Sequence, residues 1–476
     1  MGVAVSNWRL ARAVSLRGQL GVVSGTAVDT VMVRRLEDGD AGGHMRRAMA
    51  HFPIPGVSEM VLRRHYRLGG RPGDTPYHLL PMFRQRVSVA REQVTILGAF
   101  VEVWLAKEGH EGKIGMNLLT KLQMPNLASL YGAMLARVDY VLMGAGIPRE
   151  IPGALDALAA HRAAHLRFDV ETLPGGEPEL LTFDPSRHWT PPAPLARPRF
   201  LAIVSANSLA ATLARKANGR VDGFVVEGPT AGGHNAPPRG ELRLSEHGEP
   251  LYGDRDAVDL PKLAELGLPF WLAGGSGSPG ALRAALRSGA AGVQVGTLFA
   301  WCDESGIPAG LKRHVLRELL LGRVSVFTDP RASPTGYPFK VVQVGGDVTQ
   351  NEARQRVCDL GYLRTPFRRA DGRVDYRCPS EPVDDYLAKG GDLSDTIGRR
   401  CLCNGLIATV GYAQPRGAEG PERPLLTSGD DLDAVRRVLG TRENYSADDV
   451  MDYLLGEEGA EGVEATGTSP GSAASG

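Results

Sequence analysis

Short apolar runs, each followed by small or polar residues, recur along about the first 300 residues of the chain. They predict strands at residues 20–24, 113–117, 139–143, 200–204, 223–227, 269–273 and 292–296. A run without a polar break is typical of a parallel strand that is covered on both faces. Segments with apolar residues at helical spacing separate the runs, and hairpin signals are missing between them. The alternation predicts an α/β fold with a parallel sheet, open or closed into a barrel.

The segments between these runs predict helices. Helical spacing covers residues 91–107, 127–137, 151–164, 208–217, 259–266 and 304–321. The helix after residue 278 has clear boundaries, because Ser278 suits an N-cap, Pro279 the first turn and Gly289 the position just past the end. Residues 94–97 have an alternative interpretation as a strand. Residues 165–198 are polar and rich in proline, and we expect an excursion at the rim of a barrel.

The pattern divides the chain into three parts. Residues 1–322 are expected to form a barrel domain, with an insertion of helix and loop at about 53–110. Residues 323–455 are expected to form a mostly helical C-terminal extension. Residues 456–476 consist largely of Gly, Ala, Ser and Glu, and such a segment buries too little apolar surface to fold.

Composition excludes several classes of protein. Lys plus Arg and Asp plus Glu each number 54, so net charge gives no reason to expect nucleic acid or an anionic membrane as a partner. There is no apolar run of 18 residues, which argues against a transmembrane helix. Residues 1–20 lack the uninterrupted apolar core of a secretory signal. Five cysteines in 476 residues do not form a disulfide scaffold, so we expect a cytoplasmic protein.

One stretch stands out as a candidate site. Residues 223–234 read Gly-Phe-Val-Val-Glu-Gly-Pro-Thr-Ala-Gly-Gly-His. The strand must end at Pro229, and the glycines after it let a flat or phosphorylated ligand approach the backbone. His234 then stands past the carboxyl end of a buried strand, where α/β enzymes place their chemistry. The alternative is an ordinary turn with a solvated histidine.

Two later strands also end in glycine-rich turns, Gly274 to Gly277 and Gly296-Thr297. A barrel uses the loops after its last two strands to hold a phosphate with backbone N–H groups. Neither GxGxxG at a strand–helix turn nor GxxxxGK[ST] occurs, which argues against a Rossmann domain or a P-loop. The turns therefore predict a phosphate site close to His234.

Taken together, these motifs resemble a known family. Ala-Gly-Gly-His (231–234), Leu-Ala-Gly-Gly (272–275) and Gly-Val-Gln-Val-Gly-Thr (292–297), in this order and spacing, resemble the nitronate monooxygenase (2-nitropropane dioxygenase-like) family. The flavin-type enoyl-ACP reductases belong to the same superfamily. Segments 102–110, 121–125 and 131–148 look especially like the enoyl reductase subunits of polyunsaturated fatty-acid and polyketide synthases. The resemblance covers about residues 1–410.

The resemblance implies a TIM-type (β/α)8 barrel with non-covalent FMN. By correspondence with the family motifs, the FMN-binding residues are Asn117, Gly232, Gly233, Gly274, Gly275, Gly277, Gln294, Gly296 and Thr297, with Ser24 and Gly25 at the edge of the ring. His234 matches the family histidine that faces the flavin and acts as catalytic base.

The chain departs from the family in two places. Members open with a strand ending in Gln-Gly-Gly-Met or similar, whereas only seven strands are evident here, and Met1 to Ser6 resembles only the tail of the loop that follows that strand. The first strand of the barrel is thus missing or truncated, and we expect the true start of the protein to lie upstream. The second departure is Asn235 to Arg239, where family members turn sooner. Residues 235–256 are long, polar and glycine-rich, and are a candidate lid.

Three functions remain open at this point. The first is oxidation of alkyl nitronates by dioxygen, with His234 as the base. The second is reduction of an enoyl thioester by NAD(P)H through FMN, in a fatty-acid or polyketide pathway. The third is flavin binding without catalysis. The expected partners are a small-molecule substrate, an acyl carrier protein in the second case, and a second copy of the chain in a homodimer.

Four cysteines lie after the predicted barrel, namely Cys358, Cys378, Cys401 and Cys403, and Cys302 stands apart. Four thiolates are able to bind zinc or an iron–sulfur cluster. The spacing is not CxxC…CxxC, so reduced buried thiols and no metal are the simpler interpretation. The arginines between residues 63 and 86 are expected to form a solvated face, the alternative being contact with a carrier protein.

Overall fold

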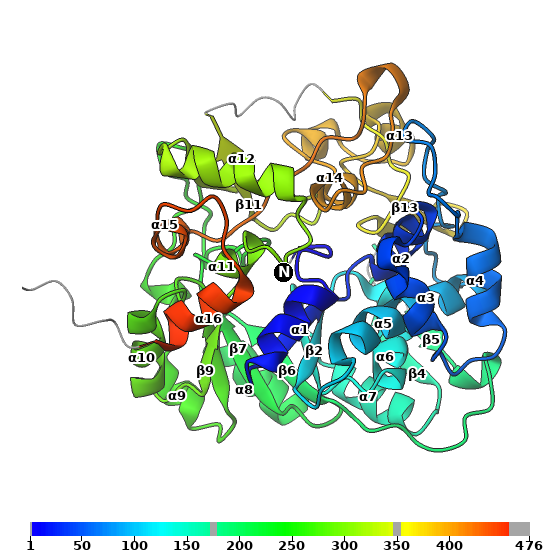
Figure 1. Cartoon of the computed structure of the whole chain (residues 1–476), viewed down its shortest axis with the longest axis horizontal. Coiled ribbons are helices and arrows are strands. Elements are labelled where there is room, and N and C mark those ends of the chain that lie inside the picture. Colours follow the sequence, from blue (N-terminus) through cyan, green and yellow to red (C-terminus); the bar gives the residue numbers. More distant parts are fainter. Residues whose placement is uncertain (1, 172–178, 346–353, 457–476) are drawn as a thin grey trace, which may run out of the picture.

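A computed structural model of the chain describes residues 2–171, 179–345 and 354–456. Its centre is a sheet of seven parallel strands in the order β1-β2-β3-β6-β7-β8-β9 (Figure 1). These are β1 (Gly21–Ser24), β2 (Ile114–Leu119), β3 (Tyr140–Gly144), β6 (Arg199–Val204), β7 (Gly223–Glu227), β8 (Phe270–Ala273) and β9 (Gly292–Gln294). They coincide with the seven predicted strands to within two residues at either end. The α/β class is therefore confirmed.

Successive residues of a strand point to opposite sides of the sheet. Because these strands are apolar at successive positions, both faces of the sheet are apolar. Phe200 and Phe224 belong to the main core, which the helices cover. Leu201 and Val225, one residue further along the same strands, pack together in a smaller cluster. Covering on both faces explains why the strands read as continuous apolar runs.

Helices form a layer over one face of the sheet. They are α2 (Val28–Glu37), α3 (His44–Met49), α4 (Val57–His65), α5 (Val89–Lys107), α6 (Gln123–Leu135), α7 (Ile151–Ala159), α8 (Asn207–Lys216), α9 (Leu260–Ala264) and α10 (Pro279–Arg287). Helix α5 packs against α2, α3, α4 and α6. At its contact with α6 a Cβ on Gly132 would lie 2.1 Å from the Ile96 carbonyl oxygen, so only glycine permits this approach. The alternative of a strand at 94–97 is wrong, because these residues form the buried middle of α5.

Strands β1 and β9 are the edges of the sheet in the part of the chain that is described. Helix α1 (Trp8–Leu16) packs on β1 and on α16 (Ala447–Leu455). Its Leu10 joins the apolar cluster that contains Leu298 and Leu454. Just before α1, the Ser6 carbonyl accepts a hydrogen bond of 2.8 Å from the Ser24 N–H. The segment before β1 thus links the β1 edge to the helices that follow β9.

The expected excursion at residues 165–198 contains regular structure that the sequence did not indicate. Strands β4 (Ala164–Phe168) and β5 (Glu179–Phe183) pair antiparallel and pack on α6 and α7. In β4, buried Leu166 and Phe168 alternate with exposed His165 and Arg167. This is the pattern of a strand with one covered face. The helical prediction for 151–164 therefore extended too far.

The C-terminal part is not simply helical. Helices α11 (Thr297–Ala300) and α12 (Ala309–Leu320) precede it, and its own helices are α13 (Val383–Ala388), α14 (Leu402–Thr409), α15 (Leu432–Leu439) and α16. Between them lie two antiparallel pairs, β10 (Val324–Asp329) with β11 (Phe339–Val344), and β12 (Thr365–Arg368) with β13 (Val374–Arg377). Helices α15 and α16 fold back onto α11 (Figure 1). The expected disordered tail lies, from residue 457 on, outside the described residues.

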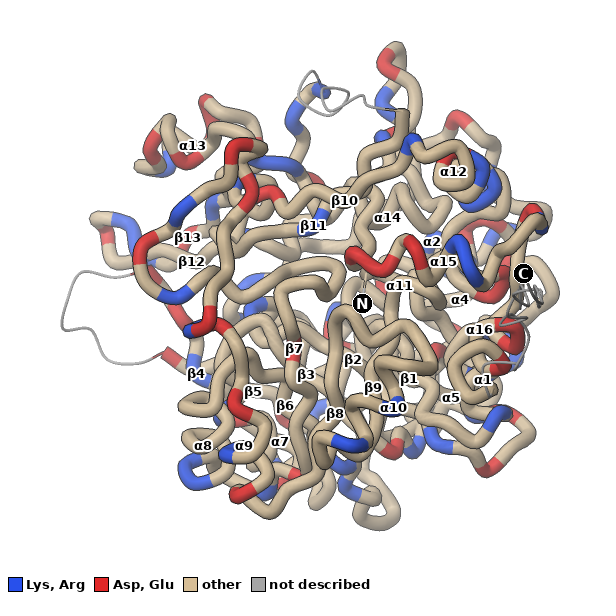
Figure 2. Tube along the Cα trace, turned by 90° about the vertical axis from the view of Figure 1, so that its left-hand side faces the viewer, with Lys and Arg blue, Asp and Glu red and all other residues tan. Residues whose placement is uncertain are grey.

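Charged residues lie mostly on the outer helices and loops, with both signs interspersed (Figure 2). Within the described ranges, no helix combines the length and the apolar character needed to cross a membrane. Neither observation adds a class of partner to those expected from the sequence.

Candidate functional site

The carboxyl ends of the parallel strands meet at one edge of the sheet, where two cavities open. The apolar cavity is lined by Asn117, His234, Phe339 and residues of the C-terminal part, and the glycine cavity by Gly274, Gly275, Gly296 and Thr297. The empty space of each, part of it open to solvent, is about 940 Å³. Both are lined by Gly2, Glu227, Gly232, Gly233, Gln294 and Thr427. Because they share these lining residues, the two cavities adjoin, and we call them together the joined space.

The glycine cavity depends on backbone conformations that other residues avoid. Gly274 has φ +88° and Gly275 has φ +64°, both left-handed. A Cβ on Gly274 would lie 2.9 Å from the Ala231 nitrogen. The turn after β8 therefore packs closely on the loop after β7, and the two backbones form one wall.

A short segment far along the chain closes this cavity. The Thr427 hydroxyl accepts from the Gly233 N–H at 3.1 Å, and the Gly429 N–H donates to the Thr297 hydroxyl at 3.1 Å. The Asp431 carboxylate accepts from the Gly277 N–H at 3.1 Å. Thr427, Ser428, Gly429 and Asp431 all line the glycine cavity. Small polar residues before a helix are common at N-caps, so nothing in the sequence indicated this role.

His234 is held by backbone pairing with β11. The N–H of Asn235 donates to the Pro338 carbonyl, and the N–H of Lys340 donates to the Gly233 carbonyl, each at 2.9 Å. The imidazole Nε2 lies 2.7 Å from the Ser333 hydroxyl, and the ring stands edge-on to Phe339 at 4.9 Å. His234 is partly buried and lines the apolar cavity.

Burial lowers the pKa of His234 to about 3, with a smaller contribution from the positive charge of Lys121. The imidazole is therefore neutral at pH 7. A neutral ring accepts a proton, but a base with so low a pKa has little driving force to do so. The position of the His234 ring also suits hydrogen bonding to a substrate.

Glu227 stands where the two cavities join, at the end of β7. Burial raises the pKa of its carboxyl group to about 7. At neutral pH the group therefore exchanges between the acid and the carboxylate. It is the titratable side chain at the centre of the space, and the sequence analysis did not select it.

The other predicted residues fall into three sets. Asn117 is buried and lines the apolar cavity, and Gln294 lines both cavities. Gly277 lines neither cavity, and its N–H is taken by Asp431. Ser24 and Gly25 also line neither, although Thr26 and Ala27, the next residues along, line the apolar cavity. No residue of the candidate lid 235–256 lines either cavity.

The C-terminal part supplies a large share of the apolar cavity. Five of its lining residues come from this part of the chain, namely Phe339, Tyr362, Leu363, Leu402 and Leu406. Apolar residues from earlier in the chain also line it, namely Val3, Leu119, Leu122 and Ile203. These side chains come from six separate segments, so their meeting could not be inferred from local pattern. The result is a space with an apolar wall and a few polar groups, which is typical of a small-molecule site.

Comparison with known proteins supports the resemblance. Residues 192–328 match the family model "Nitronate monooxygenase". This segment contains all three glycine motifs, 231–234, 272–275 and 292–297. The resemblance inferred from those motifs is confirmed.

A curated relative and two solved structures are also similar. The chain is 36% identical over 124 residues to "(3aS,4S,5R,7aS)-5-hydroxy-7a-methyl-1-oxo-octahydro-1H-indene-4-carboxyl-CoA dehydrogenase" of Mycobacterium tuberculosis, across 26% of this chain and 32% of that protein. The matched segment thus spans about a third of the relative's length. A nitroalkane oxidase from Streptomyces ansochromogenes aligns at 16% identity and a TM-score of 0.43, covering 96% of this chain and 93% of the other. The enoyl reductase domain of MlnA from Bacillus amyloliquefaciens aligns at 12% identity and a TM-score of 0.47, covering 96% and 91%.

Proposed function

We propose that the chain is an FMN-dependent oxidoreductase that reduces enoyl thioesters. The observation that carries the proposal is the joined space, with backbone turns at one end and an apolar wall with a neutral histidine at the other. The match to the nitronate monooxygenase family over residues 192–328 supports a flavin enzyme. The apolar wall favours an enoyl thioester over a nitronate as the substrate.

The residues present suit FMN. At the glycine cavity, the left-handed Gly274 and Gly275 leave room for a phosphate that a Cβ would restrict. Gly296 has no atom within 4 Å of the position of a Cβ, so the wall is open there. Asn117, Gly232, Gly233 and Gln294 would then hold the ring system. When bound, FMN supplies the redox chemistry, and the protein's part is to position the substrate against it.

Oxidation of a nitronate is the function suggested by the family. It would use His234 to take a proton from a nitroalkane. The lowered pKa of His234 makes this ring a weak base, because burial opposes the imidazolium that proton abstraction would form. A nitronate that is already ionised would not need the base, but it is small and anionic, and the apolar wall offers it little.

Reduction of an enoyl thioester agrees better with these features. Leu363, Leu402 and Leu406 offer an apolar surface to an acyl chain. Neutral His234, oriented by the Ser333 hydroxyl, would hydrogen-bond to the substrate rather than remove its proton. The name of the curated relative describes a CoA thioester as its substrate, which supports a thioester here. NAD(P)H would be the reductant, and a carrier protein or CoA would carry the acyl group.

Anaerobic reduction of the flavin-loaded protein tests the proposal. Bleaching by NADH or NADPH, followed by reoxidation with an enoyl thioester, is the expected result. Bleaching by a nitronate alone would instead support the family activity. A flavin that binds but is reduced by none of the three would indicate a non-catalytic flavin protein and overturn the proposal.

A further inference from the structure

Four cysteines that are far apart in the sequence meet at one small cavity. Cys358, Cys378, Cys401 and Cys403 all line it, and its empty space, part of it open to solvent, is about 290 Å³. Cys378 directly follows β13, Cys401 is the N-cap of α14, and Cys403 is in its first turn. The fifth cysteine, Cys302, lies apart in the cluster around Leu298. Spacing along the chain favoured unrelated buried thiols, whereas the fold brings these four together.

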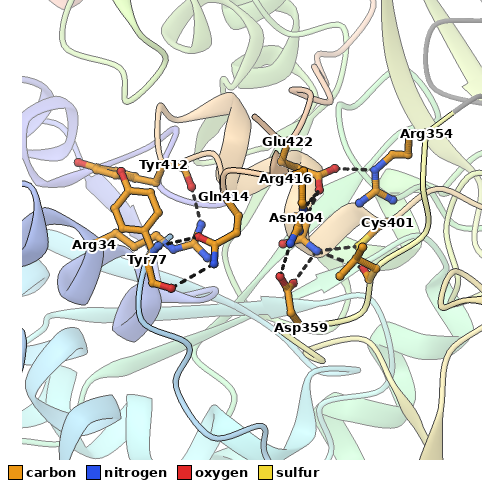
Figure 3. Close-up of polar contacts among 11 residues, drawn as sticks. Arg34, Tyr77, Arg354, Asp359, Cys401, Asn404, Tyr412, Gln414, Arg416 and Glu422 are labelled. Atoms are coloured by element: carbon orange, nitrogen blue, oxygen red, sulfur yellow. Dashed lines mark hydrogen bonds and ion pairs between the residues drawn. The ribbon is translucent and has the colours of Figure 1, made fainter. Parts of the chain in front are cut away.

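One of the four sulfur atoms accepts a hydrogen bond from a side chain. The Asn404 side-chain amide donates to the Cys401 sulfur at 3.6 Å (Figure 3). Such donors stabilise a thiolate and do little for a neutral thiol. Hydrogen bonds to sulfur are a standard feature of metal-bound thiolates.

Arginine side chains lie near the cysteines. Arg364 lines the cysteine cavity, and Arg354 and Arg356 line a neighbouring cavity that Cys401 also lines. Arg354 is held at 2.6 Å from Glu422, as Figure 3 shows. Cations near the sulfurs favour negative charge on them.

We propose that Cys358, Cys378, Cys401 and Cys403 bind an iron–sulfur cluster. Four cysteines are the complete ligand set of a [2Fe–2S] or [4Fe–4S] cluster. In the described residues, no group of three or more His, Cys, Asp or Glu side chains, these four cysteines included, is placed to hold a metal ion. A tetrahedral zinc site draws all four sulfurs to about 2.3 Å from one atom. A cluster spreads its thiolates over several irons, so its ligands surround a cavity instead.

The cluster would lie next to the candidate active site. Leu363, Leu402 and Cys403 line both the cysteine cavity and the apolar cavity. One layer of side chains therefore separates the two. The cluster would also tie together a part of the chain that has short strands, short helices and long loops, as metal sites do in small scaffolds. The inference rests on the cysteines alone and does not require the proposed function.

Chemical analysis of the full-length protein tests this inference. The protein is purified without oxygen and reconstituted with ferrous iron and sulfide, and its content of iron, acid-labile sulfide and zinc is then measured. Equal amounts of iron and sulfide, at two or four per chain, are expected, with an electron paramagnetic resonance signal after reduction by dithionite. Cys378→Ser and Cys403→Ser should each lower bound iron by at least about tenfold. Cys302→Ser is the matched control and should keep it.

Flavin content and a melting curve distinguish loss of the cluster from loss of the fold. A folded Cys378→Ser or Cys403→Ser protein that binds flavin but no iron supports the inference; if both variants unfold, the metal content of the wild type alone decides. Stoichiometric zinc without sulfide in the wild type would overturn it. A wild-type protein that holds no iron after reconstitution would also overturn the inference. The same holds if Cys302→Ser loses as much iron as Cys378→Ser and Cys403→Ser.

Discussion

The two ends of the joined space are built in different ways. At the glycine cavity, the turns after β7, β8 and β9 expose backbone, and the left-handed Gly274 and Gly275 set its shape. At the apolar cavity, side chains such as Leu363, Leu402 and Leu406 come from the C-terminal part. One end is thus fixed by short local motifs and the other by long-range packing. An end built from local motifs can therefore be recognised in a sequence, whereas an end built by long-range packing cannot.

Replacing Gly274 by alanine should most strongly damage the glycine end. The left-handed φ costs a side chain about 1 kcal/mol, and the new Cβ would press on the Ala231 backbone. We expect FMN binding to weaken by about a hundredfold, equivalent to about 2.7 kcal/mol, as measured by fluorescence titration.

Gly240→Ala is the matched control, since Gly240 also has a positive φ but has no atom within 4 Å of a Cβ and lines neither cavity. It should bind FMN like the wild type. If both variants lose FMN equally, backbone strain and not the shape of the glycine cavity is responsible.

Removing the imidazole should affect the opposite end without loss of the cofactor. We expect His234→Ala to keep FMN and to lower kcat by about a hundredfold, the usual size of a positioned proton-transfer or hydrogen-bonding group. Ser333→Ala, which frees the ring, should have a smaller effect of the same kind. The measurement is steady-state turnover together with bound flavin per chain.

His165→Ala is the control, because His165 is an exposed residue of β4 away from both cavities. Full turnover in His234→Ala would show that the histidine is only a loop residue. Selective loss of nitroalkane oxidation, with thioester reduction intact, would assign it the role of a base.

Glu227 links the two ends and should make the stability of the flavin-free protein depend on pH. Burial raises the pKa of this carboxyl from 4.5 to about 7, so the folded state holds the proton more tightly than the unfolded state. The resulting stabilisation is complete below pH 4.5 and is lost as the pH rises through 7. It amounts to about 3 kcal/mol.

Urea unfolding at several pH values measures this contribution. Glu227→Gln should remove that share of the pH dependence, and Glu265→Gln, on an exposed site, should not. An unchanged profile in Glu227→Gln would mean that the carboxyl is solvated and does not sense the joined space.

The same contrast explains what the sequence could predict. The strands were found because burial on both faces leaves continuous apolar runs, as in Phe224 to Val226. The glycine turns were found because a backbone wall requires residues without a side chain. Thr427 and Asp431 were missed, since only the fold brings them to Gly233 and Gly277. Glu227 was missed as a titrating group because burial, which raises its pKa, is not visible in a sequence.

Strand pairing of β4 with β5 was also missed, because proline and polar residues around the two strands hide their short alternation. The four cysteines of the C-terminal part were recognised as a set, but their irregular spacing gave no indication that they share a cavity. In each case the missing information was a contact between distant segments, which a local pattern does not contain.

The most direct test of the central claim compares the affinity of the flavin-free protein for FMN with its affinity for riboflavin, which lacks the phosphate. If the glycine cavity holds the phosphate, FMN should bind at least about tenfold more tightly, since hydrogen bonds to a charged group contribute about 1.5 to 3 kcal/mol. Gly274→Ala should remove most of that difference. Equal affinities in the wild type would contradict the assignment of the glycine cavity as the phosphate site.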